Sequence, residues 1–193
     1  MPVRRKNAYG VTLVELMITL VVAAILVAIA TPSFRDFIDK SRLKGVADGV
    51  VSVINDARTQ SVKQGRGVSV AFSGTTSAWC LGANAALDPT TAGDRIPDPV
   101  DCDCTSTTAC MVAGQREAFD SGETSGVILS AVPKPFVVFD SRMGTIQGLT
   151  PPNAVTLTSP QQRFQLQLTL TPLGQANLCV PSGQRAIVGY PSC

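Results

Sequence analysis

The chain has 193 residues, a length that favours one domain, or a small domain with an appendage, over a large multi-domain enzyme. It contains no histidine, which excludes histidine acid–base catalysis, Ser-His and Cys-His nucleophile pairs, and histidine metal sites. There are 16 Lys and Arg against 14 Asp and Glu, and charged residues form only 16% of the chain. This composition is too apolar for an ordinary soluble domain unless one segment carries the excess.

An apolar run near the N-terminus accounts for this excess of apolar residues. Residues 11–30 read VTLVELMITLVVAAILVAIA, with Glu15 as the only charge. At about 1.5 Å per residue, a helix of this length spans about 30 Å and can cross the hydrocarbon core of a bilayer. Arg4, Arg5 and Lys6 precede the run, so the positive-inside rule predicts a single-pass protein with a cytoplasmic N-terminus.

Three ordinary interpretations of this N-terminus compete. A cleaved secretory signal finds a weak cleavage site at residues 28–30, but the apolar run is too long and leads into Thr31-Pro32 and then charged residues. A twin-arginine signal rests on the Arg4-Arg5 pair alone. A plain signal anchor leaves Glu15 unexplained, because an ionisable side chain inside an apolar span is costly and usually has a partner.

A further pattern accounts for the glutamate. A basic leader ends at Gly10, Val-Thr-Leu-Val-Glu follows, and Pro32 is the twenty-second residue after the glycine. This arrangement resembles the class III signal and first helix of type IV pilins and type II secretion pseudopilins. The resemblance implies that a prepilin peptidase cuts between Gly10 and Val11, that Val11 is N-methylated, and that Glu15 and Pro32 serve assembly. The family usually has Phe at the position of Val11, where this chain departs from the pattern.

Elementary electrostatics supports the same residues. Cleavage would leave a positive amine on Val11 in apolar surroundings, and the Glu15 carboxylate of a neighbouring subunit is a partner that offsets such a buried charge. The alternative is that Glu15 reaches the cytoplasmic interface of a monomeric anchor.

The pattern divides the chain into four segments. These are a leader at 1–10, a transmembrane and filament-core helix at 11–32, an amphipathic helix at 33–65, and a β-rich headpiece at 66–193. Pro32 is expected to kink the helix, because proline removes a backbone donor. Glycines at 45 and 49 would loosen it, and those at 65 and 67 would end it.

The amphipathic segment is expected to bury one stripe of apolar side chains. The residues expected in this stripe are Phe37, Val46, Val50, Val53 and Ala57. Charged residues are expected largely on the other faces, and they include Arg35, Asp39, Lys40, Arg42, Lys44, Asp48, Asp56 and Arg58.

Beyond Gly67 the apolar period changes to two, which indicates strands. Alternation at 68–72 and 164–170, and short apolar runs at 127–129 and 136–139, predict an antiparallel sheet or small sandwich packed against the helix. The predicted class is therefore α+β. Residues 83–108 lack a strand period and are expected to form a long exposed loop, whereas Trp79 is expected to anchor the core.

The headpiece carries short motifs of its own: Asp56-Ala57-Arg58, WCLG at 79–82, FVVFDSRMG at 136–144 and LGQANLC at 173–179. They resemble the GspH/FimT family of minor pilins and pseudopilins. Some members are DNA receptors with a Gly-Arg-x-Arg motif, but residues 174–177 here read Gly-Gln-Ala-Asn and lack both arginines. From Arg66 onward there are seven basic residues against nine acidic ones, so nucleic acid is not an expected partner.

Six cysteines lie in the part expected to leave the cytoplasm, and they predict three disulfides. They are Cys80, Cys102, Cys104, Cys110, Cys179 and Cys193. Proximity in the sequence favours pairing Cys179 with Cys193, then Cys80 with Cys102 and Cys104 with Cys110. A zinc site is the alternative, although Cys-x-x-Cys and histidine are both lacking.

Two further possibilities concern ligands and catalysis. Asp98, Asp101 and Asp103 could bind Ca²⁺, but three acids without EF-hand spacing are more often a solvated surface. A Ser-Lys hydrolase is conceivable without histidine, but no motif favours it. The sequence therefore predicts a structural protein with no cofactor and no resident metal.

The resemblance implies a subunit that helps to initiate assembly of a type IV pilus or a type II secretion pseudopilus. Its expected partners are other pilins, the prepilin peptidase, an inner-membrane assembly platform and the lipid bilayer. The expected place is the bacterial inner membrane, with the headpiece in the periplasm until the subunit enters a filament. The alternative function is a DNA-binding minor pilin for natural transformation.

Overall fold

A computed structural model of the protein describes residues 10–85, 102, 104, 106, 109–120, 126–130, 137–147 and 154–193. Residues 1–9 of the leader, most of the expected loop at 83–108, and Asp98, Asp101 and Asp103 lie outside the described residues. The chain forms two compact units, residues 1–38 and residues 39–193.

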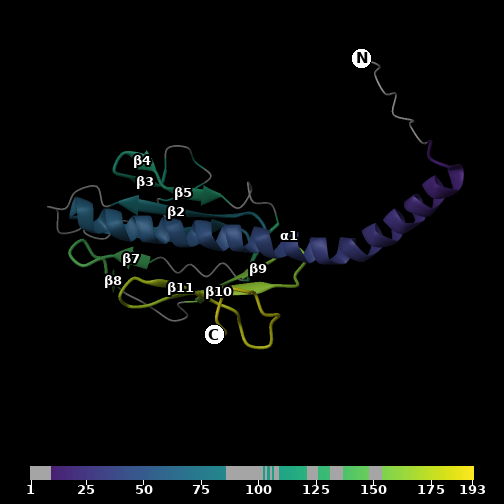
Figure 1. Cartoon of the computed structure of the whole chain (residues 1–193). Coiled ribbons are helices and arrows are strands. Elements are labelled where there is room, and N and C mark those ends of the chain that lie inside the picture. Colours follow the sequence, from purple (N-terminus) through teal and green to yellow (C-terminus); the bar gives the residue numbers. More distant parts are fainter. Residues whose placement is uncertain are drawn as a thin grey trace, which may run out of the picture. The chain divides into compact units, whose positions relative to one another are not determined.

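One helix, α1 (Leu13–Gln64), runs through both predicted helical segments (Figure 1). It continues through Pro32, so the proline does not end it. It stops where the sequence predicts, because Gly65 adopts a left-handed conformation with φ of +62°, which suits glycine at the end of a helix.

Two antiparallel sheets make up most of the headpiece. The first has the order β5-β2-β1-β7-β8, with β1 (Val68–Gly74), β2 (Trp79–Ala85), β5 (Ala118–Asp120), β7 (Val137–Phe139) and β8 (Ile146–Gln147). The second has the order β11-β10-β9-β6, with β6 (Ile128–Ser130), β9 (Ala154–Thr158), β10 (Gln165–Leu170) and β11 (Ala176–Cys179). A small hairpin joins β3 (Met111–Val112) to β4 (Gln115–Arg116). The predicted α+β fold is confirmed.

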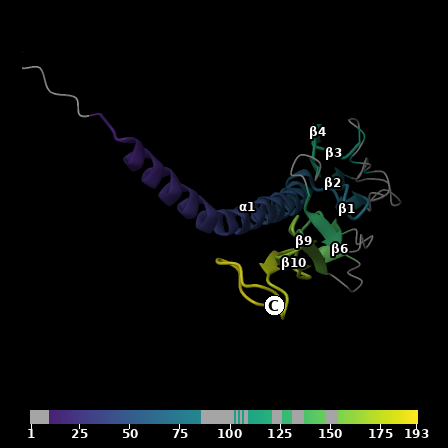
Figure 2. The same ribbon diagram turned by 90° about the vertical axis from the view of Figure 1, so that its right-hand side faces the viewer.

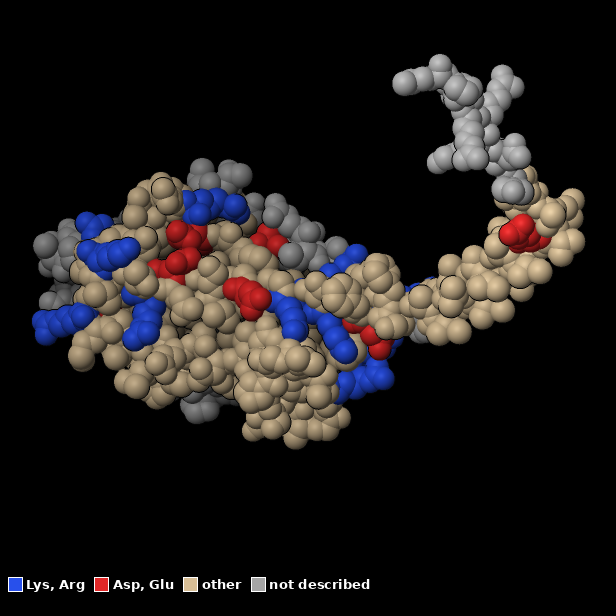
Figure 3. Space-filling view, viewed as in Figure 1, with Lys and Arg blue, Asp and Glu red and all other residues tan. Residues whose placement is uncertain are grey.

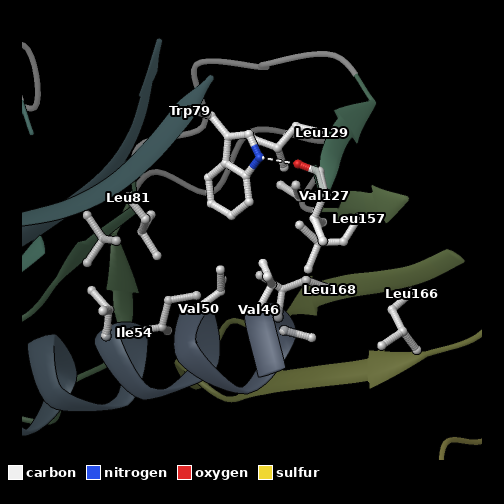
Figure 4. Packing of buried hydrophobic residues seen from close by; sticks show 14 of the residues in the cluster. Val46, Val50, Ile54, Trp79, Leu81, Val127, Leu129, Leu157, Leu166 and Leu168 are labelled. Carbon is white, nitrogen blue, oxygen red and sulfur yellow. Dashed lines mark hydrogen bonds between the residues drawn. The ribbon is translucent and has the colours of Figure 1, made fainter. Parts of the chain in front are cut away.

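The second half of α1 packs against both sheets (Figures 1 and 2). Figure 4 shows Val46, Val50 and Ile54 of the helix facing Trp79 and Leu81 of β2 and leucines of β6, β9 and β10. Trp79 is 1% exposed, and its indole Nε1 donates a hydrogen bond of 2.9 Å to the carbonyl oxygen of Val127. The prediction that Trp79 anchors the core is confirmed.

Two assignments on the helix were wrong. Phe37 is 66% exposed, and it lies nine residues before Val46, about two and a half turns away, on the opposite face of an ideal helix. Asp39, expected on a solvated face, is 3% exposed, because it lies one turn before the buried Leu43 and so belongs to the apolar stripe. The expected loop also begins too early, since residues 83–85 complete β2.

All six cysteines form disulfides, and the Cys179–Cys193 pairing is confirmed. The other two expected pairings are wrong: Cys80 pairs with Cys104, and Cys102 pairs with Cys110. Period two along β2 explains the difference, because Cys80 and Gly82 share one face of the strand. The Cys102 and Cys110 sulfurs lie against Gly82, where a Cβ would overlap them. Cys104 therefore forms the disulfide with Cys80.

Gly49 serves packing rather than loosening the helix. A Cβ at this position would overlap the ring of Phe119 in β5. The centroid of this ring lies 6.2 Å from the centroid of the Trp79 ring. Gly45, one turn earlier on α1, has open space where its Cβ would lie. A side chain would therefore fit at position 45, whereas at position 49 it would overlap the ring of Phe119.

We predict that Gly49→Ala destabilises the headpiece, because overpacking a fitted contact typically costs about 1–3 kcal/mol. Gly45→Ala is the matched control and should stabilise the protein by up to about 1 kcal/mol, because alanine favours the helix. Fluorescence of the single tryptophan in detergent-solubilised full-length protein would follow unfolding by urea. Equal stabilisation by both substitutions would contradict the close contact with Phe119.

Candidate functional site

The expected processing site lies just before α1. Gly10 and Val11 are exposed and precede the helix, which begins at Leu13. The Thr12 side-chain oxygen accepts a hydrogen bond of 3.3 Å from the backbone N–H of Glu15. Thr-x-x-Glu is the signature of a capping box, so the sequence contains a signal for this helix start that the expectations above did not include. Thr12 and Glu15 thus define where the helix begins beside the predicted cleavage site.

The first half of α1 is uncovered by the part of the chain that the structure describes. None of the side chains in its apolar window is buried, and the large apolar residues from Val11 to Ile29 are 50–74% exposed. Among the described residues, α1 is the helix long and apolar enough to cross a membrane. Glu15 lies in this surface, in the first turn of the helix. An apolar surface of this extent marks a membrane-embedded or protein-covered segment.

The entry of α1 into the headpiece is fixed by Asp39. Its carboxylate accepts hydrogen bonds from the hydroxyl of Ser159, at 2.8 Å, and from the backbone N–H of Gln161, at 3.2 Å. The Ser159 oxygen in turn accepts hydrogen bonds from the backbone N–H groups of Arg163 and Phe164. This network holds the turn between β9 and β10 to the helix.

Three cations lie at this turn and a fourth, Lys44, lies one helical turn after Lys40 on α1; we call the four the basic cluster: Lys40, Lys44, Arg163 and Arg185. The Lys40 ammonium lies 4.7 Å from the centre of the Phe164 ring, and the Arg185 guanidinium lies 5.6 Å from it. Arg163 Nε is 3.9 Å from an Asp39 carboxylate oxygen. Arg163 and Arg185 are separated by 21 residues, so local sequence spacing does not predict that they come close to the same turn.

The C-terminal loop docks on α1 beside this cluster. The Cys179–Cys193 disulfide closes the loop, and Ile187 is 1% exposed. The Lys44 ammonium donates to the carbonyl oxygen of Val188 at 2.7 Å, and the Tyr190 hydroxyl donates to Asp48 at 3.4 Å. Burial, followed by the charge of Asp48 and its hydrogen bond, raises the pKa of Tyr190, so the phenol remains a donor. Closure of the loop was predicted, but its docking on the helix was not.

The structure therefore separates the predicted site residues into groups. Gly10, Val11, Glu15 and Pro32 lie in the first unit, and the cysteines lie in the headpiece. Cys80, Cys102, Cys104 and Cys110 form one buried cluster, whereas the third disulfide ties the C-terminal end to β11. Of the Gly-Gln-Ala-Asn stretch, Gly174 and Gln175 precede β11 and Ala176 and Asn177 begin it, and none of the four belongs to the basic cluster.

We predict that Asp39→Ala destabilises the headpiece by about 1–3 kcal/mol, because it removes the acceptor of the Ser159 hydroxyl and the Gln161 N–H. Asp56→Ala provides the control, since it removes an exposed carboxylate from the same helix and should change stability by no more than about 0.5 kcal/mol. Urea unfolding of the full-length protein in detergent would measure both. Equal effects of the two substitutions would contradict the conclusion that Asp39 holds the turn between β9 and β10 to the helix.

Comparison with known protein families gives one match in the N-terminal segment and another that covers most of the headpiece. A search of curated protein sequences finds no match. A crystal structure of the type IV minor pilin FimU from Pseudomonas aeruginosa matches with 15% identity and a TM-score of 0.39, over 70% of this chain and 90% of that one. The family model for the prokaryotic N-terminal methylation motif matches residues 5–31. The model for the type II transport protein GspH matches residues 46–174, more than half of the chain, and the protein therefore belongs to the GspH family.

Proposed function

We propose that this pilin-like protein is a structural subunit of a type IV pilus or a type II secretion pseudopilus. In this proposal a prepilin peptidase processes it after Gly10, and the mature subunit helps to initiate filament assembly. The observation that carries the proposal is the uncovered apolar half of α1, with one carboxylate in its first turn. The methylation motif over residues 5–31 coincides with that segment.

The apolar surface requires two successive environments. Before assembly, the bilayer covers it, with Arg4, Arg5 and Lys6 holding the N-terminus in the cytoplasm and the headpiece in the periplasm. During assembly at a platform in the inner membrane, the corresponding segments of neighbouring subunits replace the lipid. Exposed side chains along the whole apolar segment suit such an exchange.

Glu15 supplies the electrostatic reason for the processing step. Removal of residues 1–10 creates an amine on Val11 beside the start of an apolar helix. In a filament this cation and the Glu15 carboxylate of a neighbour neutralise each other, which offsets the cost of burying either one. Without cleavage the amine is absent at this position and the carboxylate has no such partner.

The first prediction of this mechanism concerns processing. In cells that contain prepilin peptidase, the mature chain should begin at a methylated Val11, because Gly10 precedes the apolar helix directly. Intact-mass analysis of protein extracted from membranes measures both changes. Gly10→Val should leave the leader attached and serves as the uncleaved reference. A wild-type chain that keeps residues 1–10, or one that begins near Thr31, would overturn the proposal.

The second prediction concerns assembly. Glu15→Gln should leave membrane insertion and headpiece folding intact but prevent normal incorporation into filaments, because removing one partner of a buried ion pair typically costs about 3–5 kcal/mol. Thr19→Ala is the control, since Thr19 lies in the same exposed span and its hydroxyl only donates to the Leu16 carbonyl within the helix. Quantitation of each variant in purified filaments tests the difference. Equal recovery of the two variants would exclude the proposed charge pair.

A further inference from the structure

The basic cluster has a defined geometry. Phe164 is 2% exposed, so its ring is a fixed platform against which Lys40 and Arg185 are positioned. Lys44 lies one helical turn from Lys40 and is held by its hydrogen bond to the Val188 carbonyl. Figure 3 shows several Lys and Arg side chains, with Asp and Glu side chains among them, on one face of the headpiece. The four cations of the cluster come from three separate segments: α1, the turn between β9 and β10, and the C-terminal loop.

The acidic groups among these residues do not cancel the cluster's charge. Asp39 is buried and accepts hydrogen bonds from Ser159 and Gln161, and Asp48 accepts one from Tyr190. Asp36, one helical turn before Lys40, is a third carboxylate with an interaction of its own. These three carboxylates against four cations leave a small positive balance on a headpiece whose side chains from Arg66 onward are acidic in balance. A surface of this kind favours an anionic partner.

The position of the cluster along the chain indicates which kind of anion it binds. Lys40 is only ten residues beyond Ala30, where the apolar run ends, and α1 is continuous between them. At about 1.5 Å per residue, the continuous helix keeps Lys40 within about 15 Å of the end of the anchoring run. Tyr190, under Lys44, is a residue type enriched at membrane interfaces.

We propose that the basic cluster binds the phosphate groups of anionic phospholipids in the leaflet from which the apolar run emerges. This inference rests on the proposed membrane anchoring of α1. Bound headgroups hold the headpiece of the unassembled subunit against the membrane, and the contact is lost when the subunit leaves the bilayer for the filament. Duplex DNA presents the same phosphate chemistry, but it must be captured from solution, whereas the anchor keeps lipid phosphates beside the cluster at all times.

The test uses the full-length chain in nanodiscs of phosphatidylcholine alone or of an equimolar mixture of phosphatidylcholine and phosphatidylglycerol. Hydrogen–deuterium exchange is measured in residues 159–164 and 181–190. Exchange should be at least about fivefold slower in the anionic discs, the factor that a single Lys or Arg contributes near an anionic surface. Salt at about 1 M should abolish the difference, because the Debye length falls to about 3 Å.

Two double variants identify the residues responsible. Lys40→Gln with Arg185→Gln should remove the protection by anionic lipid. Lys63→Gln with Arg142→Gln removes as much charge from the last turn of α1 and from the turn between β7 and β8, both exposed, and should preserve it. Tryptophan fluorescence and circular dichroism in neutral discs verify that each variant is folded.

Three results would overturn the proposal. These are equal exchange in the two lipids, equal loss of protection in both double variants, or low-micromolar binding of duplex DNA in neutral discs that only the Lys40/Arg185 variant loses, without protection by anionic lipid. Failure of the chain to enter either kind of disc would instead contradict the membrane anchor itself and hence the proposed function.

Discussion

The structure depends on an apolar surface that the chain does not cover. From Val11 to Ile29 the large apolar side chains stay 50–74% exposed among the residues that the structure describes. Burying apolar surface is worth roughly 25 cal/mol per Å², so water is a costly environment for this segment. In the proposed function, lipid and then other copies of the segment supply the cover.

The headpiece has a hydrophobic core of its own, which begins at Leu43 of α1. Its core combines the second half of α1 with the inner faces of two sheets, centred on Trp79 and the leucines opposite Val46 and Val50. Asp39 and the C-terminal loop fasten the helix to the headpiece at its entry, and three disulfides restrain the loops. A unit that is complete in this way can keep its fold while the surroundings of the apolar segment change.

Local periodicity predicted much of this fold, because it reports which face of an element is buried. The helix, its end at Gly65, the strand pattern at 68–72 and the anchoring role of Trp79 all follow from neighbours in sequence. Contacts between distant segments were not predictable in this way. The Cys80–Cys104 pairing depends on a shared strand face, and the convergence of Lys40 with Arg185 depends on how the C-terminal loop docks.

The central claim is that the apolar half of α1 is covered first by lipid and then by neighbouring subunits. A single cysteine introduced at Leu20, which is 63% exposed in the isolated chain, tests this directly with a membrane-impermeant maleimide. Val188→Cys, in a residue that is 88% exposed on the headpiece loop, provides the reactive reference. The account predicts that the cysteine at position 20 is unreactive both in membranes and in intact filaments, while the one at 188 reacts in membranes. Rapid labelling at position 20 in either environment would contradict the account.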